Sequence, residues 1–218
     1  MDKSFNYIIS PEISKFRRFS PKLKIGVLAS GKGTNFQELI NLSEKGEFDI
    51  DITVLITNKE DAGCIKRAQK AQIPYKIIKN KHFSQKVEFE SEIINTLINY
   101  DVELIVMAGW MKIVTPFFVN KFKNKIINIH PSLLPAYKGG SAIEDSILNG
   151  SKITGCSVHF VEEEVDSGSL IMQAALPIFD DDNIDTLSKK IQILEHKILP
   201  HSISYAGFLI RNNFKDSY

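Results

Sequence analysis

Apolar runs alternate with amphipathic segments along the first 130 residues. The apolar runs are rich in β-branched residues and lie at 23–30, 50–58, 75–79, 102–109 and 125–130. Runs of this kind predict strands that are buried on both faces, as in a parallel sheet. Helical spacing occurs between them, at 34–46, 59–72, 83–100 and 115–122. The alternation predicts an α/β fold: a single Rossmann-like domain with a mostly parallel sheet and helices on both faces.

The predicted helix at 83–100 shows the packing that we expect. Ser84 suits the N-cap because its hydroxyl can accept a hydrogen bond from a free backbone N–H. The helical period then predicts an inner, buried face. That face would consist of Val87, Ile94, Leu97 and Ile98.

The order of elements changes after Gly140. Residues 152–178 contain two apolar runs joined by the turn sequence DSG. This arrangement predicts a C-terminal antiparallel hairpin and therefore a mixed sheet. The segment 184–210 has a helical pattern, which we expect to be interrupted at Pro200.

The same patterns divide the chain into three parts. Residues 1–21 form an N-terminal extension, residues 22–210 form the folded domain, and residues 211–218 form a C-terminal tail. The extension is mixed polar and aromatic and is closed by Pro21. It is either a disordered tail or an arm packed on the domain.

Composition narrows the functional classes. With 43% hydrophobic residues among 218, the chain can bury one good core. A net charge of +1 gives no reason to expect nucleic acid or an acidic membrane as a partner. No apolar run reaches the roughly 20 residues of a membrane span, and the first residues do not resemble a secretory signal. We therefore expect a cytoplasmic protein that acts on small molecules, as a monomer or a homodimer.

Neither a metal site nor a disulfide framework is expected. Cys64 and Cys156 lie far apart and in no metal-ligand spacing. Four of the histidines are weak functional candidates and form no metal-binding motif. These are His82, His159, His196 and His201.

A glycine-containing turn follows the first predicted strand of the domain. The sequence SGKGTN (30–35) can expose backbone N–H groups at a helix N-terminus, where the helix dipole favours an anion. It lacks the third glycine of the dinucleotide fingerprint, since Phe36 stands there. On position alone, a phosphate site and a plain structural turn are equally good interpretations.

A second polar group ends the predicted strand at 125–130. Asn128, His130 and Ser132 alternate, so an extended chain would point them to one face. A histidine can carry a proton near neutral pH, and an asparagine can donate to a developing oxyanion. Asp166, in the hairpin turn, is the best partner for the histidine. The alternatives are a strand that simply ends before Pro131 and an ordinary turn aspartate.

Three segments together resemble the folate-dependent formyltransferase family. SGKGTN, NIHPSLLP (128–135) and GCSVHFVEEEVDSG (155–168) occur in the order and spacing of that family. The resemblance runs from about Lys24 to about Gly207. With QILEH (192–196), SGKGTN points to the members that act on glycinamide ribonucleotide. The resemblance implies transfer of a formyl group from the co-substrate 10-formyltetrahydrofolate to the amine of that ribonucleotide in purine biosynthesis, with no metal.

The resemblance also implies roles for individual residues. His130 matches a catalytic proton carrier, Asn128 the amide that binds the formyl oxygen, and Asp166 the carboxylate that supports the histidine. Ser132 then becomes part of the scaffold. The residues matching the contacts to the phosphoribosyl substrate are Gly33, Thr34, Asn35 and Glu195. Those matching the folate contacts are Lys86, Met111, Lys112, Ile113 and Val114, together with Asn128.

The chain departs from the common pattern at three places. Lys86 and Lys112 replace arginines, and a lysine cannot reproduce the two-pronged hydrogen bonding of a guanidinium. KGGSAIED (138–145) lacks the histidines often found there, so backbone contacts are expected instead.

Four other functions are weighed against this one. Within the superfamily these are a methionyl-tRNA formyltransferase and a formyltetrahydrofolate hydrolase, whose motif has a second histidine where Pro131 stands. A nucleotide-binding oxidoreductase is disfavoured by the missing third glycine and by Thr57 and Asn58 in place of a ribose-binding acid. A non-catalytic binding module would leave the Asn128, His130 and Asp166 set unexplained.

Overall fold

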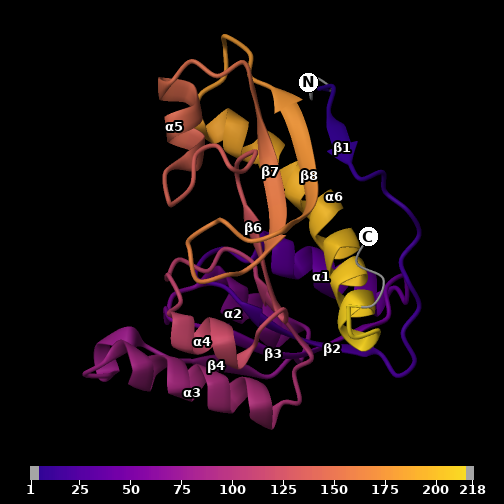
Figure 1. Cartoon of the computed structure of the whole chain (residues 1–218), viewed down its shortest axis with the longest axis vertical. Helices are drawn as coiled ribbons and strands as arrows, with labels where there is room; N and C mark the ends of the chain where they lie inside the picture. Colours follow the sequence, from indigo (N-terminus) through magenta and orange to yellow (C-terminus); the bar gives the residue numbers. More distant parts are fainter. Residues whose placement is uncertain (1–4, 215–218) are drawn as a thin grey trace.

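In the computed structural model, which describes residues 5–214, eight strands form one sheet in the order β1-β8-β7-β6-β5-β2-β3-β4 (Figure 1). The strands are β1 Ile8–Ser10, β2 Leu23–Leu28, β3 Ile50–Thr57, β4 Tyr75–Ile77, β5 Leu104–Met107, β6 Ile126–His130, β7 Ile153–Phe160 and β8 Leu170–Pro177. The helices are α1 Thr34–Glu44, α2 Gly63–Lys70, the short 3₁₀ helix η1 Asn80–His82, α3 Lys86–Asn99, α4 Pro116–Lys121, α5 Ala142–Leu148 and α6 Ile184–Arg211.

The sheet is mixed, as the sequence predicts. Strands β2 to β6 pair in parallel. The pairs β6–β7, β7–β8 and β8–β1 are antiparallel. The predicted fold class, a single α/β domain with a C-terminal antiparallel hairpin, is confirmed.

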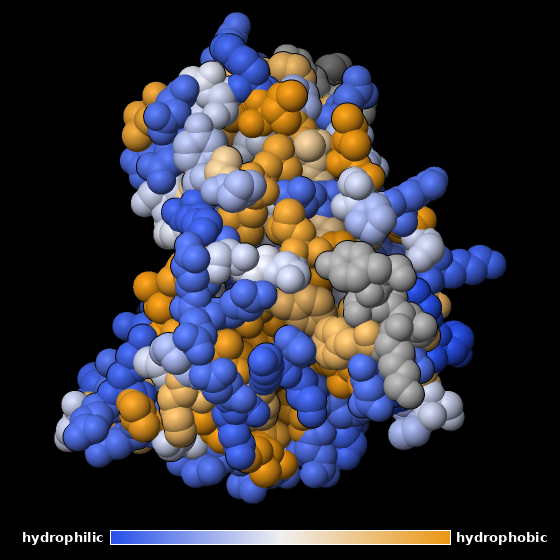
Figure 2. All heavy atoms as spheres, viewed as in Figure 1, coloured by the Kyte–Doolittle hydropathy of each residue, from blue (hydrophilic) through white to orange (hydrophobic). Residues whose placement is uncertain are grey.

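The two faces of the sheet have separate apolar cores. One core packs α1, α2 and α6 against alternate residues of the strands, and α5 joins it at its edge. The other core packs α3 and α4 against the opposite face of β2, β3 and β5. Because α3 and α4 stop at β5 and β6, the face of β6 and β7 that points away from α6 is left to form a site. In Figure 2 hydrophobic and hydrophilic residues are interspersed over the visible surface.

Helix α1 begins where a glycine is required. Gly33 is its N-cap and has a left-handed backbone with φ of 69°. A Cβ at this position would lie 2.6 Å from the Cβ of Cys64. Any larger residue would therefore be strained and would push α2 away from the turn.

Helix α3 corrects two details of the sequence prediction. Its N-cap is Gln85, not Ser84, and Glu88 completes a capping box with it. Ile94 and Leu97 are buried as predicted, whereas Val87 and Ile98 are exposed. The buried face is rotated toward Phe89, Glu90 and Ile93, because α4 as well as the sheet packs on α3.

Helix α6 is not interrupted at Pro200, so that prediction is wrong. The proline removes one backbone hydrogen bond, but the helix continues to Arg211. Leu199 and Ile203 on either side are fully buried against the sheet. Tertiary packing along this face therefore holds the helix together across the proline.

The described part of the N-terminal extension is a packed arm. β1 adds antiparallel to the edge strand β8. Farther along, the ring of Phe16 stacks on Phe48 and on His201, and Phe19 is buried. The arm lies beside β8 and α6 in Figure 1. Residues 1–4 of the extension and 215–218 of the predicted tail lie outside the described residues.

Candidate active site

A cavity of about 520 Å³ lies at the carboxyl ends of the parallel strands. Strand β2 pairs with β3 on one side and with β5 on the other. This is the switch point in strand order, where open α/β sheets bind ligands. The loops that follow β2, β5 and β6 line the cavity, together with the turn between β7 and β8 and one side of α6.

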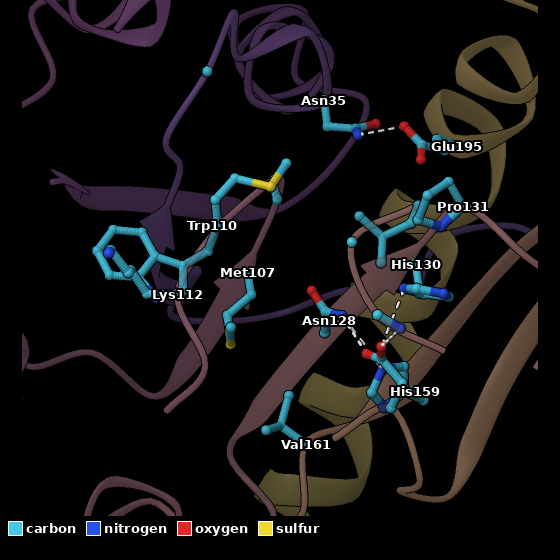
Figure 3. Close-up of a pocket in the computed structure, with 18 of the residues that line it drawn as sticks. Asn35, Met107, Trp110, Lys112, Asn128, His130, Pro131, His159, Val161 and Glu195 are labelled. Atoms are coloured by element: carbon cyan, nitrogen blue, oxygen red, sulfur yellow. Dashed lines mark hydrogen bonds and ion pairs between the residues drawn. The ribbon is translucent and has the colours of Figure 1, made fainter. Parts of the chain in front are cut away.

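Two antiparallel strands supply the deepest polar side chains. On β6, Ile127 and Ile129 belong to the core shared with α6. Side chains alternate along a strand, so Asn128 and His130 point to the opposite face and line the cavity. In the β6–β7 register, Asn128 pairs with His159, which lines the same cavity. Figure 3 shows Asn128, His130 and His159 pointing toward one another.

The carboxylate of Asp166 lies at the centre of this polar cluster. Its Oδ2 is 3.4 Å from Nδ1 of His130, and its Oδ1 is 3.6 Å from Nε2 of His159. Asn128 donates from Nδ2 to Oδ1 at 3.5 Å, and the backbone N–H of Gly139 donates to Oδ2 at 2.9 Å. The structure therefore brings together the three residues that the sequence singles out.

Gly139, whose N–H bonds Asp166, belongs to the segment KGGSAIED (138–145). The sequence predicts that this segment, which lacks histidines, uses backbone contacts. Within the described residues, the hydrogen bond of this segment to the polar cluster is made by a backbone N–H, and Gly139 and Gly140 both line the cavity. Gly139 has φ of 92°, a conformation that a residue with a side chain rarely adopts.

The charge of Asp166 is stabilised by its neighbours. Burial by itself would raise the pKa of this carboxyl, but the nearby His159 side chain, the hydrogen bond from the Gly139 N–H and the charge of His130 lower it to about 2. Asp166 is therefore ionised at any pH at which the protein would work.

The imidazole of His130 is hydrogen-bonded at one nitrogen and faces a carboxylate with the other. Nε2 donates to the backbone carbonyl of Tyr137 at 2.8 Å. Nδ1 faces Asp166 at 3.4 Å, which is longer than an ordinary hydrogen bond. A proton on Nδ1 would therefore remain available to a ligand oxygen or a water near Asp166. His130 itself is buried, so its ring has a fixed orientation.

Sequence reasoning gave His159 too little weight. It is 2% exposed, its Nδ1 lies 2.7 Å from the Phe160 carbonyl, and its Nε2 lies 3.3 Å from Nδ2 of Asn128. The signal was present, because His159 alternates with Ser157 on one strand face. The sequence pattern does not contain the β6–β7 register, which places His159 beside Asn128.

Ser132 belongs to the scaffold. Its hydroxyl donates to the Ala136 carbonyl at 2.5 Å, and its own carbonyl accepts from the Ser157 hydroxyl at 2.7 Å. Ser132 is fully buried and does not line the cavity. These bonds fold the NIHPSLLP turn back on β7 and hold the end of β6 in place.

The opposite end of the cavity is formed by α1 and α6. Gly33, Thr34 and Asn35 line it from the start of α1. Asn35 donates from Nδ2 to Glu195 Oε2 at 2.9 Å, and Gln192 donates to the Thr34 hydroxyl at 2.8 Å. Figure 3 shows Asn35 and Glu195 facing each other at the end of the cavity opposite the polar cluster. Gln192, which lies one helical turn before Glu195, is an addition to the predicted set.

This end of the cavity has unused hydrogen-bonding capacity. The Oδ1 atom of Asn35 is buried and has no partner among the described residues. Burial raises the pKa of the Glu195 carboxyl, and the hydrogen bond from Asn35 lowers it only in part. A ligand that offers hydroxyl donors would satisfy both residues. An anion would suit the free N–H groups at the start of α1.

The wall of the cavity after β5 is mainly apolar. The residues that line it are Met111, Lys112, Ile113 and Val114. Met111 and Ile113 are 68% and 63% exposed, so they cover the cavity without being buried themselves. Lys86 does not line the cavity; it is exposed at the first residue of α3. The structure therefore gives no geometric support for a contact between Lys86 and a ligand in this cavity.

Within residues 5–214, no group of three or more His, Cys, Asp or Glu side chains is placed to hold a metal ion. None of the helices described is both long enough and apolar enough to cross a membrane.

Comparison with known proteins places these features in a family. The model of the formyl transferase family matches residues 23–203. A phosphoribosylglycinamide formyltransferase from Haemophilus influenzae is 43% identical over 182 residues, which are 84% of this chain and 86% of that protein. Trifunctional purine biosynthetic proteins adenosine-3 from Chironomus tentans and Homo sapiens are 42% and 39% identical. The matched region is 14% and 18% of the length of these two relatives.

Solved structures agree with the sequence matches. A glycinamide ribonucleotide transformylase from Symbiobacterium toebii superposes with a TM-score of 0.83 at 35% identity, over 90% of this chain and 92% of the other. A phosphoribosylglycinamide formyltransferase from Coxiella burnetii has a TM-score of 0.79 at 41% identity, over 84% and 86%. The family match begins at residue 23, so the packed arm lies outside it.

Proposed function

The chain belongs to the formyl transferase family, and from this membership we propose that it transfers the formyl group of 10-formyltetrahydrofolate to the amine of N1-(5-phospho-D-ribosyl)glycinamide. The products are the N-formyl ribonucleotide and tetrahydrofolate, in the purine pathway that its relatives serve. One observation carries the proposal: Asn128, His130 and Asp166 meet in one cavity with the SGKGTN turn at its other end.

The reaction requires donors for a new negative charge. When the amine attacks the formyl carbon, the tetrahedral centre has a negative oxygen and a positive nitrogen. The amide of Asn128 and, once it is protonated, the imidazole of His130 can donate to this oxygen, and both side chains already lie beside Asp166 in the free protein. Fixed donors aimed at a developing oxyanion provide one of the largest contributions to catalysis.

The protons then have to be exchanged between two nitrogens. The attacking amine loses a proton, the bond between the formyl carbon and N10 of the folate breaks, and N10 gains a proton. His130 is the group that can carry this proton, because Asp166 stays negative and supports the imidazolium. No redox partner or metal is needed to balance the step.

The rest of the cavity positions the two substrates. The phosphate and ribose would lie against Gly33, Thr34, Asn35 and Glu195, where free N–H groups, an unpaired amide oxygen and a carboxylate are present. The pteridine would lie along Met111 to Val114. Such side-by-side binding supplies the orientation that a reaction between two substrates needs.

A direct assay tests the proposal. Purified protein is mixed with 10-formyltetrahydrofolate and the ribonucleotide, and tetrahydrofolate formation is followed by absorbance. We expect turnover that depends on both substrates. Parallel reactions contain methionyl-tRNA, or water alone, as the acceptor. Formylation of methionyl-tRNA, or hydrolysis without the ribonucleotide, would reject the proposed acceptor.

A further inference from the structure

We infer that Glu90, a buried carboxylate on α3 outside the cavity, is a positioning residue that fixes the folate-binding wall formed by residues 111–114. This inference rests on the proposed function, because it assigns that wall to the folate. Glu90 does not line the cavity. It acts through Thr115, the residue that follows the wall.

Glu90 makes two bonds to Thr115. Its Oε1 accepts from the Thr115 backbone N–H at 2.8 Å, and its Oε2 accepts from the Thr115 hydroxyl. Thr115 is the N-cap of α4, and Pro116 follows at the first helical position. The carboxylate therefore also lies at the positive end of the α4 dipole. Both bonds fix the exit of the wall.

The entrance of the wall is fixed in a similar way. The backbone N–H of Met111 donates to the Ser30 hydroxyl at 3.1 Å, and that hydroxyl donates to Asn58 Oδ1 at 2.7 Å. Ser30 is almost completely buried. Trp110 immediately precedes Met111, and its ring stacks on that of Phe89, the neighbour of Glu90, with ring centroids 6.4 Å apart. Two buried side chains, Ser30 and Glu90, therefore fix the two ends of the wall by hydrogen bonds.

The anchors are needed because packing holds little of the wall: Val114 packs against the core on the α3 side, and residues 111–113 are exposed. Met111 and Ile113 are mostly exposed, so little burial energy fixes their positions. A segment of this kind would otherwise sample many conformations. Two hydrogen-bonded ends reduce that freedom before the ligand arrives, which is how preorganisation strengthens binding.

The chemistry of Glu90 supports a specific role. The residue is 1% exposed and lies on the inner face of α3, where every other buried residue except Thr96 is apolar. Burying a carboxylate is costly unless it is well bonded. Within residues 5–214 the Glu90 carboxylate forms no ion pair, and both of its hydrogen bonds go to Thr115. An apolar residue would pack on this face at lower cost but would release the wall.

The experiment compares Glu90→Gln with Glu92→Gln in the full chain. Glu92 lies on the same helix but is exposed, in an ion pair with Lys76, and serves as the matched control. Tetrahydrofolate is titrated while the fluorescence of Trp110, the chain's single tryptophan, is followed. We expect Glu90→Gln to weaken tetrahydrofolate binding roughly tenfold, the loss of one charged hydrogen bond. The KM for the ribonucleotide should change less than about twofold, and Glu92→Gln should match the parent.

Hydrogen–deuterium exchange gives a readout that does not depend on activity. Residues 110–117 should exchange faster in Glu90→Gln, while residues 30–35 should not change. If Glu90→Gln fails to fold, Thr115→Val removes the hydroxyl bond alone and Thr115→Ser restores it. Parent-like folate binding in Glu90→Gln and Thr115→Val, or equal weakening of both substrates, would overturn the inference. Absence of tetrahydrofolate binding by the parent protein would instead reject the proposed function.

Discussion

At the end of the cavity formed by β6 and β7, polar side chains bond mainly to one another. At the end formed by α1 and α6, hydrogen-bonding groups are left unpaired. Asp166 has partners on both oxygens before any ligand binds, whereas Oδ1 of Asn35 is buried without a partner in the described part of the chain. The carboxylates at the two ends, Asp166 and Glu195, show the same contrast between a paired and a poorly paired group. The pKa of Asp166 is lowered to about 2 by its partners, and that of Glu195 is raised by burial.

This difference separates two tasks. A group that stabilises a transition state works best when it is already oriented and charged, because no reorganisation is then needed during the reaction. A group that recognises a substrate has to leave part of its bonding capacity unused. We therefore expect substitutions at the first end to lower kcat and substitutions at the second end to raise KM.

The largest effect is expected for Asp166→Asn. Loss of the charge removes the support for a protonated His130 while keeping a side chain of the same shape. We expect kcat to fall about 10³-fold, within the range known for general acid–base groups, and both KM values to stay within a few fold. Steady-state kinetics with each substrate varied in turn measures this.

Asp180→Asn is the matched control for that variant. Asp180 lies outside the cavity lining, is exposed and pairs with Lys152. Its substitution should leave kcat unchanged, because exposed ion pairs contribute little. A kinetically silent Asp166→Asn would show that His130 works without its carboxylate and would remove the contrast between the two ends.

The second prediction concerns Glu195→Gln. The amide keeps an acceptor but loses the charge that would hold the ribose hydroxyls. We expect the KM for the ribonucleotide to rise about tenfold or more, with little change in kcat or in the KM for folate. Equal losses in kcat and in kcat/KM would place Glu195 in the transition state and would contradict the separation of tasks.

The same variant should be more stable than the parent at neutral pH. A carboxyl whose pKa is raised by folding contributes stability below its unfolded pKa, near 4.5, and loses that contribution as the pH rises through its folded value. Thermal unfolding should therefore show Glu195→Gln above the parent at pH 7 and close to it near pH 4. This gain would be evidence that the carboxylate is kept for binding rather than for stability.

Sequence and structure agree best where a pattern is local. The alternation on β6 was enough to put Asn128 and His130 on one face. Asp166 could be predicted because the turn of the C-terminal hairpin lies at the same edge of the sheet as the end of β6. His159 was underrated because it depends on the pairing of two strands about 30 residues apart, which periodicity does not contain.

Pro200 predicts a break in the helix, but a helix buried along one whole side continues across it. The folate contact of Lys86 comes from family resemblance alone and stays a prediction, and the residue lies outside the cavity lining. Glu90 has no sequence signal, since its partner Thr115 is 25 residues away at the start of another helix.

The third prediction uses acid unfolding to test the polar cluster. A carboxyl whose pKa is lowered by folding contributes stability above its unfolded pKa, near 3.8, and loses it as the pH falls toward about 2. The parent should therefore lose on the order of 1 kcal/mol more than Asp166→Asn between pH 4 and pH 2. Urea unfolding at several pH values measures the difference. Parallel curves for the two proteins would mean that Asp166 gains nothing from its partners in the folded state.

The smallest effect is expected for Ile113→Ala on the folate wall. Ile113 is largely exposed in the free protein, so its loss should leave the unfolding temperature unchanged within error. Ile113 would then act when the folate binds, because an apolar side chain that a ligand partly covers contributes about two- to fivefold to affinity. We therefore expect that increase in the KM for 10-formyltetrahydrofolate, with the ribonucleotide KM and kcat unaffected. Ile153→Ala, another exposed isoleucine outside the cavity, is the control and should match the parent. A fall in stability without a change in folate KM would make Ile113 a packing residue and would restrict ligand recognition to the α1 and α6 end.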